Sequence, residues 1–278
     1  MPAPTPASPP ARPAQASLPL HDWLAAWLRD WWQLIHLGAV LLVLALSPSS
    51  YRAANRPKLA WHIYSNTAPI LMGFSLVCAL ITVVLTRIVL TTALSYGLTQ
   101  YALQVLIRVL VLELIPLTAA LFVALRCTIP DGAEVAALQS SGALDRLRAR
   151  GQEPIRTEVL PRVVAGLLAG VTLAALSSAV ALVVAYLVGY GPTVAGLPAY
   201  TRMFGQVFSP AVCLILVLKT ILFSMAVSLI PMASALYGLR GLYGQSVRTS
   251  TEMHSLVRMF ALVLLIEVAS LVGNYSGF

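Results

Sequence analysis

The sequence predicts an all-α integral membrane protein, in which an N-terminal interfacial helix precedes five transmembrane helices. Of the residues, 59% are hydrophobic and only 10% are charged, and the mean hydropathy is +0.84. A soluble domain carries about 25% charged residues, so too few polar side chains remain here to cover a water-exposed surface. Residues 59–86 and 163–201 contain no Asp, Glu, Lys or Arg. Each run exceeds the roughly 18 residues that a spanning helix needs.

The N-terminal region divides into two parts of different composition. Residues 1–17 are rich in proline and alanine, which cannot form an apolar core, so we expect a disordered arm. Residues 18–46 are predicted to form an amphipathic helix lying along the membrane. Trp23, Trp27 and Trp31 recur at every fourth position and share one helical face, and tryptophan favours the headgroup level. An ordinary first transmembrane helix with a tryptophan belt is the alternative.

Five apolar segments follow, and the distribution of basic residues orients them. The spans are predicted at 61–91, 101–125, 163–188, 210–236 and 256–271. Three connecting stretches, 47–60, 126–162 and 238–258, hold 12 of the 18 basic residues, whereas the opposite loops hold only Arg202. Cytoplasmic loops are enriched in Lys and Arg. We therefore expect a cytoplasmic N-terminus and a C-terminus on the opposite side.

The stretch 126–162 is the long polar passage of the chain after the N-terminal arm, with six basic and five acidic residues. Between two spans it faces water, so a soluble partner can bind it. Asp131 and Glu134 have the spacing of a capping box, which predicts a helix starting at Gly132. The helix is expected to end in a basic last turn, with Gly151 just beyond it. From the residues alone, a docking element and a solvated loop with good caps are equally supported.

Several kinds of chemistry find no support in the sequence. Cys78, Cys127 and Cys213 are far apart and form no CxxC pair, so we expect no disulfide framework or metal site. The four histidines are scattered without metal-ligand spacing. Isolated arginines without interleaved aromatic residues do not indicate nucleic-acid binding, despite the net charge of +8. We therefore expect no metal, no cofactor and no catalytic residues.

Short motifs from 113 to 162 carry a resemblance to a known family. They are Glu113-Leu114-Ile115-Pro116, Ala119-Ala120-Leu121, Arg126, Ala133-Glu134, Leu144-Asp145-x-Leu147, Gly151-Gln152-Glu153-Pro154-Ile155-Arg156 and Leu160-Pro161-Arg162-Val163. Their spacing without gaps resembles the MlaE/YrbE-type permeases of phospholipid ABC transporters. The chain departs from the family pattern at Leu112, Ile115 and Gly142-Ala143, so the resemblance implies a divergent member with a permease domain at 59–278.

The resemblance implies partners and a site for one of them. It implies a homodimer in the bacterial inner membrane, a cytoplasmic ABC ATPase, a periplasmic MCE-domain protein and phospholipid as substrate, with the C-terminus periplasmic. The loop 126–162 would be the coupling loop that enters a groove of the ATPase. The expected contact residues are Leu144, Asp145, Arg146, Arg148, Gly151, Glu153 and Pro154. The chain itself has no Walker A motif, so ATP hydrolysis is expected in the partner subunit.

Ionisable residues inside the spans form a second candidate site. Glu113 and Lys219 both match positions of the family, and charged residues within a membrane are costly unless they face a cavity or a partner. We expect these two to line the lipid pathway, and a purely structural ion pair is the alternative. Arg87 and Arg108 lie toward the outer ends of their spans, where snorkelling to the headgroups is expected.

A second class of function stays open at this point. The chain has the composition of any polytopic membrane protein, so a non-transport role, such as an intramembrane lipid-modifying enzyme or an assembly scaffold, is the alternative to a permease. No set of a nucleophile and a base is readable in the sequence to favour that enzyme.

Overall fold

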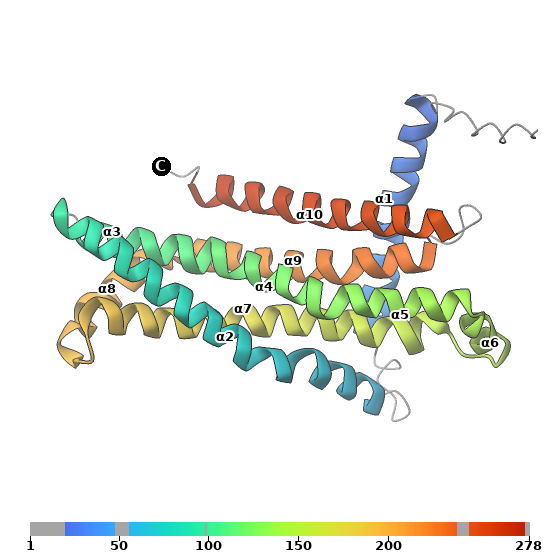
Figure 1. The fold of residues 1–278 in the computed structure, drawn as a ribbon, viewed down its shortest axis with the longest axis horizontal. Coiled ribbons are helices and arrows are strands. Elements are labelled where there is room, and N and C mark those ends of the chain that lie inside the picture. Colours follow the sequence, from blue (N-terminus) through green and yellow to red (C-terminus); the bar gives the residue numbers. More distant parts are fainter. Residues whose placement is uncertain (1–19, 48–55, 98, 238–244, 276–278) are drawn as a thin grey trace, which may run out of the picture.

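The computed structural model describes residues 20–47, 56–97, 99–237 and 245–275, and these are almost entirely helical (Figure 1). In chain order the elements are α1 (Leu20–Leu46), α2 (Arg56–Ser95), α3 (Thr99–Ile107), η2 (Arg108–Leu114), α4 (Ile115–Val123), η3 (Ala124–Thr128), α5 (Ile129–Ser140), α6 (Ala143–Ala149), η4 (Ile155–Val159), α7 (Leu160–Tyr190), η5 (Val194–Gly196), α8 (Leu197–Val207), α9 (Pro210–Tyr237) and α10 (Gln245–Tyr275). Segments η2, η3 and η4 are π-helical. The predicted all-α class is confirmed across the described part of the chain.

Five helical segments among the described residues are long and apolar enough to cross a membrane, which confirms the predicted number. They are Arg56–Ser95, Tyr101–Ser140, Ile155–Tyr190, Pro210–Tyr237 and Met253–Asn274. They form an elongated bundle in which α7 packs along α2 and α9, and α10 packs on α9 (Figure 1). The expected arm at 1–17, Arg52 of the first basic loop and Arg240 of the last lie outside the described residues.

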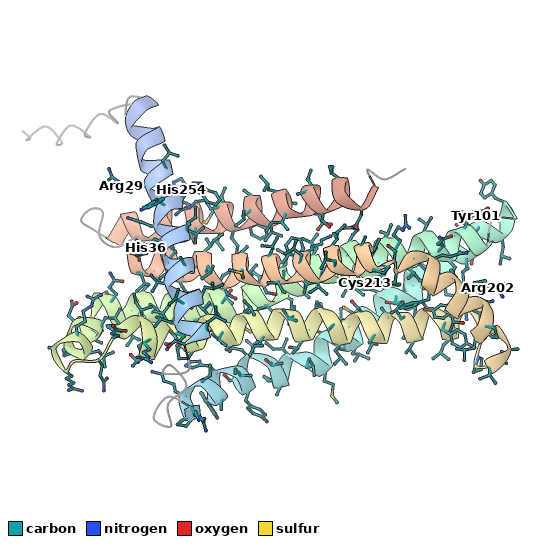
Figure 2. The ribbon with its side chains drawn as sticks, turned by 180° about the vertical axis from the view of Figure 1, so that it is seen from behind. Arg29, His36, Tyr101, Arg202, Cys213 and His254 are labelled. Carbon is teal, nitrogen blue, oxygen red and sulfur yellow. The ribbon has the colours of Figure 1, made fainter. Side chains whose placement is uncertain are left out.

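Helix α1 crosses the bundle at a steep angle, nearer the end that carries α6 (Figure 1). Figure 2, seen from behind, shows Arg29 and His36 along this helix. Leu37 and Leu41 are buried against α7 and α9, while the large apolar side chain of Trp32 is exposed. A helix that lies in the plane of the membrane must run across the direction of the spans, as α1 does. The interfacial assignment stays a prediction.

The predicted capping box at Asp131 and Glu134 is wrong. Helix α5 begins at Ile129, directly after η3, so the chain is already helical at Asp131 and there is no helix start to cap. The buried carboxylate of Asp131 instead accepts a hydrogen bond from Asn66 Nδ2 of α2 at 3.0 Å. The Glu134 carboxylate lies 3.3 Å from Arg162 Nη2. Both acids therefore serve tertiary contacts rather than a local cap.

Each of the three π-helical segments ends two residues before a proline, namely Pro116, Pro130 and Pro161. Proline has no N–H for the carbonyl four residues earlier, and its ring collides with that carbonyl in a regular α-helix. A wider π turn relieves the collision, so the helices stay continuous through these prolines. Pro69 and Pro231 lie inside α2 and α9 without a π segment, and nothing in the structure explains the difference.

The loop between the predicted spans 163–188 and 210–236 contains a helix that sequence reasoning missed. Helix α8 buries Tyr200, Met203 and Val207 in an apolar cluster with residues of α3 and α7. The Tyr200 hydroxyl donates to the Leu182 carbonyl at 2.8 Å. Burial raises the pKa of Tyr200 to about 12, so the hydroxyl keeps its proton as a donor. The i, i+3, i+7 spacing of the buried side chains was the available signal.

Candidate functional site

The central polar passage folds into a finger at one end of the bundle, built from α5, α6 and their flanking turns (Figure 1). We define the finger as residues 129–154. The sequence predicts one continuous helix here, but a turn at Ser141-Gly142 divides it. Gly142 has a φ of +68°, in the left-handed region that favours glycine. The division lets α6 fold back as a separate short helix at the tip.

The C-terminal end of the finger is as predicted. Gly151 follows the last turn of α6 and has a φ of +73°. Its N–H donates to the Arg148 carbonyl at 2.9 Å, and the Gln152 N–H donates to the Leu147 carbonyl at 3.1 Å. This pair of bonds is the Schellman motif, which satisfies carbonyls left free at a helix end. The tip is therefore an ordered structure and not a flexible linker.

The residues expected to contact a partner divide into an exposed and a buried group. The exposed group lies on α6 and the turn after it: Asp145, Arg146, Arg148, Gly151 and Glu153. Asp145 and Arg148 form an exposed ion pair at 2.8 Å. Leu144 and Pro154 are buried, so they hold the finger in place and do not present a surface to a partner. The exposed group offers charged side chains of both signs on one rigid tip.

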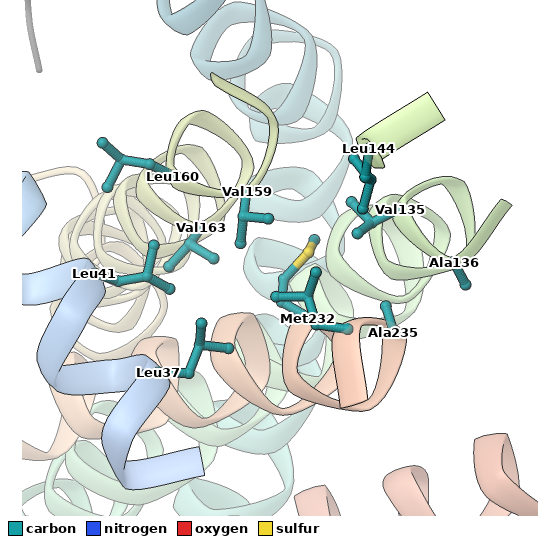
Figure 3. Packing of buried hydrophobic residues seen from close by; sticks show 11 residues of the cluster. Leu37, Leu41, Val135, Ala136, Leu144, Val159, Leu160, Val163, Met232 and Ala235 are labelled. Carbon is teal, nitrogen blue, oxygen red and sulfur yellow. The ribbon is translucent and has the colours of Figure 1, made fainter. Parts of the chain in front are cut away.

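The underside of the finger is packed on the bundle through an apolar cluster (Figure 3). Leu144 of α6 and Val135 of α5 lie on one side of this cluster, Val159 and Val163 lie across from them, and Met232 of α9 extends between. The side chains of Leu37 and Leu41 from α1 close the other side of this cluster. The finger, α1, α7 and α9 therefore share one core.

A network of charges lies at the base of the finger, and sequence reasoning missed it. Arg162, whose side chain is only 7% exposed, donates to Glu158 Oε2 at 2.9 Å and to Glu134 Oε2 at 3.3 Å. Glu158 Oε1 also accepts from Lys58 Nζ of α2 at 2.5 Å. The i, i+4 spacing of Glu158 and Arg162 was a usable signal. Lys58 carries no comparable signal, because its partner Glu158 lies 100 residues away in the chain.

Glu113 and Lys219 are brought together inside the bundle. The Lys219 ammonium forms an ion pair with the Glu113 carboxylate, and a second one at 2.8 Å with Glu267 Oε2 of α10. Asn274 Nδ2 donates to Glu113 Oε1 at 3.3 Å. The Lys219 side chain is 1% exposed, and those of the two carboxylates are 11% and 12% exposed. With all three groups ionised, this intramembrane cluster carries a net charge of −1.

Pro116 explains one further bond of Lys219. A residue at this position would normally donate its N–H to the Leu112 carbonyl, and proline cannot. Lys219 Nζ donates to that carbonyl at 3.0 Å. The Lys219 ammonium group therefore pairs with two carboxylates, and it also donates to the backbone carbonyl for which the proline supplies no N–H. The π-helical turn of η2, which contains Glu113, ends two residues before this proline.

The two candidate sites occupy different parts of the molecule. The finger tip lies at one end of the bundle, whereas Glu113 precedes α4, which lies along its length (Figure 1). Arg87 is exposed on α2 and Arg108 is half-buried in η2. Among the described residues, no group of three or more His, Cys, Asp or Glu side chains could hold a metal ion. The structure therefore presents two kinds of site, namely a charged surface for docking at the finger tip and an ion-pair cluster within the membrane-spanning bundle.

The comparisons with known proteins give one positive finding. The family model described as "Permease MlaE" matches residues 59–272, which is most of the chain. The match includes the finger, the Arg162, Glu158 and Glu134 members of the charge network, and the intramembrane cluster, while Lys58 lies one residue before it. The search of curated proteins found no match.

Proposed function

This chain belongs to the MlaE permease family, and from that premise we propose that it passes phospholipid between the inner membrane and a periplasmic MCE-domain protein. It is a multi-pass membrane protein and a permease subunit of a lipid ABC transporter. We further propose that two copies form a homodimer and that each copy binds a cytoplasmic ABC ATPase. ATP hydrolysis is then the task of that partner, since the chain has no Walker A motif.

The finger is the observation that supports ATPase docking. It presents charged side chains on a tip closed by a Schellman motif, and its underside is packed into the core. A docking element must hold its shape while a partner pushes on it, and this construction meets that need. Asp145, Arg146, Arg148, Gly151 and Glu153 are the proposed contact residues.

The orientation of the chain follows from the same assignment. With the finger in the cytoplasm, the N-terminus lies on the cytoplasmic side and the C-terminus in the periplasm. The positive-inside rule supports this arrangement, because the six arginines of residues 126–162 are on the finger side. Helix α1 would then lie in the cytoplasmic leaflet, across the direction of the spans (Figure 1).

The intramembrane cluster is the proposed part of the lipid pathway. Glu113 and Lys219 hold charge at a depth where it is costly, and they do so beside a π-helical turn. Such turns are frequent at functional sites. A charged pair in this place can attract the headgroup of a phospholipid that crosses the bundle. We propose that both residues line or gate that route.

Reversing the charge of two tip residues is expected to abolish ATPase binding. In D145K/E153K the partner surface meets charges of the wrong sign, and juxtaposed like charges cost several kcal/mol. The exposed Asp145–Arg148 pair contributes less than about 1 kcal/mol, so folding should be preserved. The measurement is the yield of ATPase that co-purifies with tagged permease from native membranes.

The control for this experiment is R202E, which alters a charge at the opposite end of the bundle (Figure 2). It is expected to leave the yield of ATPase unchanged. Full co-purification with D145K/E153K would refute docking through the finger.

Replacing Glu113 by glutamine is expected to reduce lipid transport without loss of stability. Lys219 keeps its ion pair with Glu267 in E113Q, and the cluster becomes neutral. Lipid movement between donor and acceptor vesicles would be measured alongside the thermal midpoint in detergent. If E113Q moved lipid at the wild-type rate with an unchanged midpoint, Glu113 would have no role in the pathway.

A further inference from the structure

One face of α2 is directed at the base of the finger. Lys58, His62 and Asn66 recur at every fourth position and share that face. Lys58 Nζ donates to Glu158 Oε1 at 2.5 Å, and Asn66 Nδ2 donates to Asp131 Oδ2 at 3.0 Å. Asp131 lies where the chain enters the finger, and Glu158 lies just after the chain leaves it. Helix α2 therefore forms hydrogen bonds to both segments that connect the finger to the bundle. We call the segment at Asp131 the entering leg and the segment at Glu158 the leaving leg.

Arg162 joins those two legs to each other. Its Nη2 donates to Glu134 Oε2 on the entering leg. Its Nη1 donates to Glu158 Oε2, and to the Glu158 carbonyl at 2.7 Å, on the leaving leg. Because Glu158 also accepts from Lys58, a continuous chain of charges runs from the finger to α2. We call the contacts of Arg162, Glu158, Glu134 and Lys58, together with the Asn66–Asp131 bond, the joint.

The chemistry of the joint fixes direction as well as distance. A guanidinium group is planar and presents its donors in a rigid fork, so two carboxylates held by it keep one mutual orientation. Charge-assisted hydrogen bonds are also about twice as strong as neutral ones. Apolar contacts in the neighbouring core permit sliding, whereas these bonds do not. The joint therefore orients the base of the finger relative to the start of α2. The Arg162–Glu158 pair is its most buried contact, since the Glu134 and Lys58 side chains are 65% and 40% exposed.

Helix α2 leads from the joint to the apolar exterior of the bundle. It packs along α7, and its other side carries a stripe of exposed apolar residues at every fourth position. These residues are Met72, Leu76, Leu80, Val84 and Ile88. A rotation or shift of the finger would therefore appear as a movement of a lipid-facing surface.

We propose that Arg162 is a positioning residue that fixes the finger to α2, so that movement of the finger reaches the membrane through α2. The inference rests on the proposed function, in which an ATPase moves the finger. Arg162 itself contacts neither the partner nor the lipid. Its role is to keep the distance and angle between the finger tip and α2 constant during the cycle.

The test measures lipid moved per ATP hydrolysed, with the permease and its ATPase reconstituted together in vesicles. R162Q is expected to bind the ATPase and to permit hydrolysis, while lipid moved per ATP falls roughly tenfold. R162K keeps the charge but lacks the planar fork, so an intermediate value is expected. R202Q, which removes an arginine from the opposite end of the bundle, is the matched control and is expected to couple normally.

A pair of exchanged residues provides a second arm that does not depend on the folding of R162Q. N66D places two carboxylates face to face across the joint and is expected to lower lipid moved per ATP. The double variant N66D/D131N restores the hydrogen bond with donor and acceptor exchanged, and is expected to recover coupling. Damage to the fold that does not arise at this hydrogen bond would not be repaired in this way.

Two results would overturn the inference. The first is a normal ratio of lipid to ATP in both R162Q and N66D. The second is that lipid transport and ATP hydrolysis both fall in proportion to the amount of folded protein in R162Q and N66D, and that neither recovers in N66D/D131N. Either result, obtained while the wild-type chain binds its ATPase and moves lipid, refutes the joint alone. Failure of the wild-type chain to bind an ATPase refutes the proposed function as well.

Discussion

Lys219→Met is expected to lower the free energy of unfolding by about 3–5 kcal/mol. The substitution keeps the apolar stem of the side chain and removes the ammonium group. Glu113 and Glu267 would then face each other inside the bundle without a counter-charge. Breaking a buried ion pair on one side is strongly destabilising, because it leaves an uncompensated charge away from water. The measurement is thermal unfolding in detergent, followed by the helical circular dichroism signal.

Removing all three charges together is expected to restore most of that loss. Replacing a whole buried charge cluster by neutral groups of similar size is often close to neutral in stability. In E113Q/K219M/E267Q, the remaining deficit is expected to be about 1–3 kcal/mol, because the Leu112 carbonyl loses its donor. A K219M variant as stable as the wild type would contradict the cluster. So would a triple variant no more stable than K219M.

The spans could be predicted from the sequence because the membrane imposes a local requirement. About 20 consecutive apolar residues are needed to cross it, and that length can be counted without knowing the fold. The alternation of basic and neutral loops is equally local. The C′ position of Gly151 was predictable for a related reason, since a left-handed residue at a helix end is a property of that one turn.

The start of the finger shows where prediction from a short stretch of sequence fails. Asp131 and Glu134 have capping-box spacing, but a capping box acts only where the preceding chain is not helical. Here η3 continues the second span into α5, and a π turn before Pro130 has no simple sequence signature. The partner of Asp131 is Asn66, 65 residues away. That pairing depends on α2 packing in place, which no short window can reveal.

The intramembrane cluster was predictable in its members but not as a cluster. The cost of charge in a membrane singles out Glu113 and Lys219 individually. Their contact joins residues 106 positions apart, and the third member, Glu267, comes from α10, another distant part of the chain. Arg162 was missed as a structural centre because it was read as part of a motif and a positive loop. Its burial is a property of the assembled bundle.

The packing of α7 on α9 was also missed, although its signal was present. Gly166 and Gly170 lie four residues apart in an apolar run, and this GxxxG spacing permits close approach of membrane helices. They face Ser228 and Ser224 of α9. Lipid tails offer no hydrophobic driving force between helices, so close backbone contact carries much of this interface. The α7–α9 pair is therefore sensitive to a single added methyl group.

Gly170→Ala is expected to destabilise the bundle by about 1–3 kcal/mol, which is typical of overpacking. A Cβ atom at position 170 would lie 2.3 Å from Ser224 Oγ and 3.1 Å from Ser224 Cβ, so the hydroxyl must rotate away and the two helices must separate by a few tenths of an ångström. The larger Gly170→Val should prevent the native α7–α9 contact. Unfolding in detergent would be followed as for Lys219, with Gly73→Ala as the control. No atom lies within 4 Å of a Cβ at Gly73, so this variant should be as stable as the wild type or slightly more stable.

The double variant G170A/S224G separates crowding from every other effect of the alanine. Removing the Ser224 side chain leaves its Cα at 3.7 Å from the new Cβ, an ordinary contact. The helix propensity that alanine adds to α7, about 0.8–1.0 kcal/mol, is partly offset by the glycine placed in α9, since serine is a poorer helix former than alanine. Stability should therefore return to within about 1 kcal/mol of the wild type. If S224G failed to rescue G170A, the two helices would not meet at these residues, and the close approach of α7 and α9 would have to be abandoned.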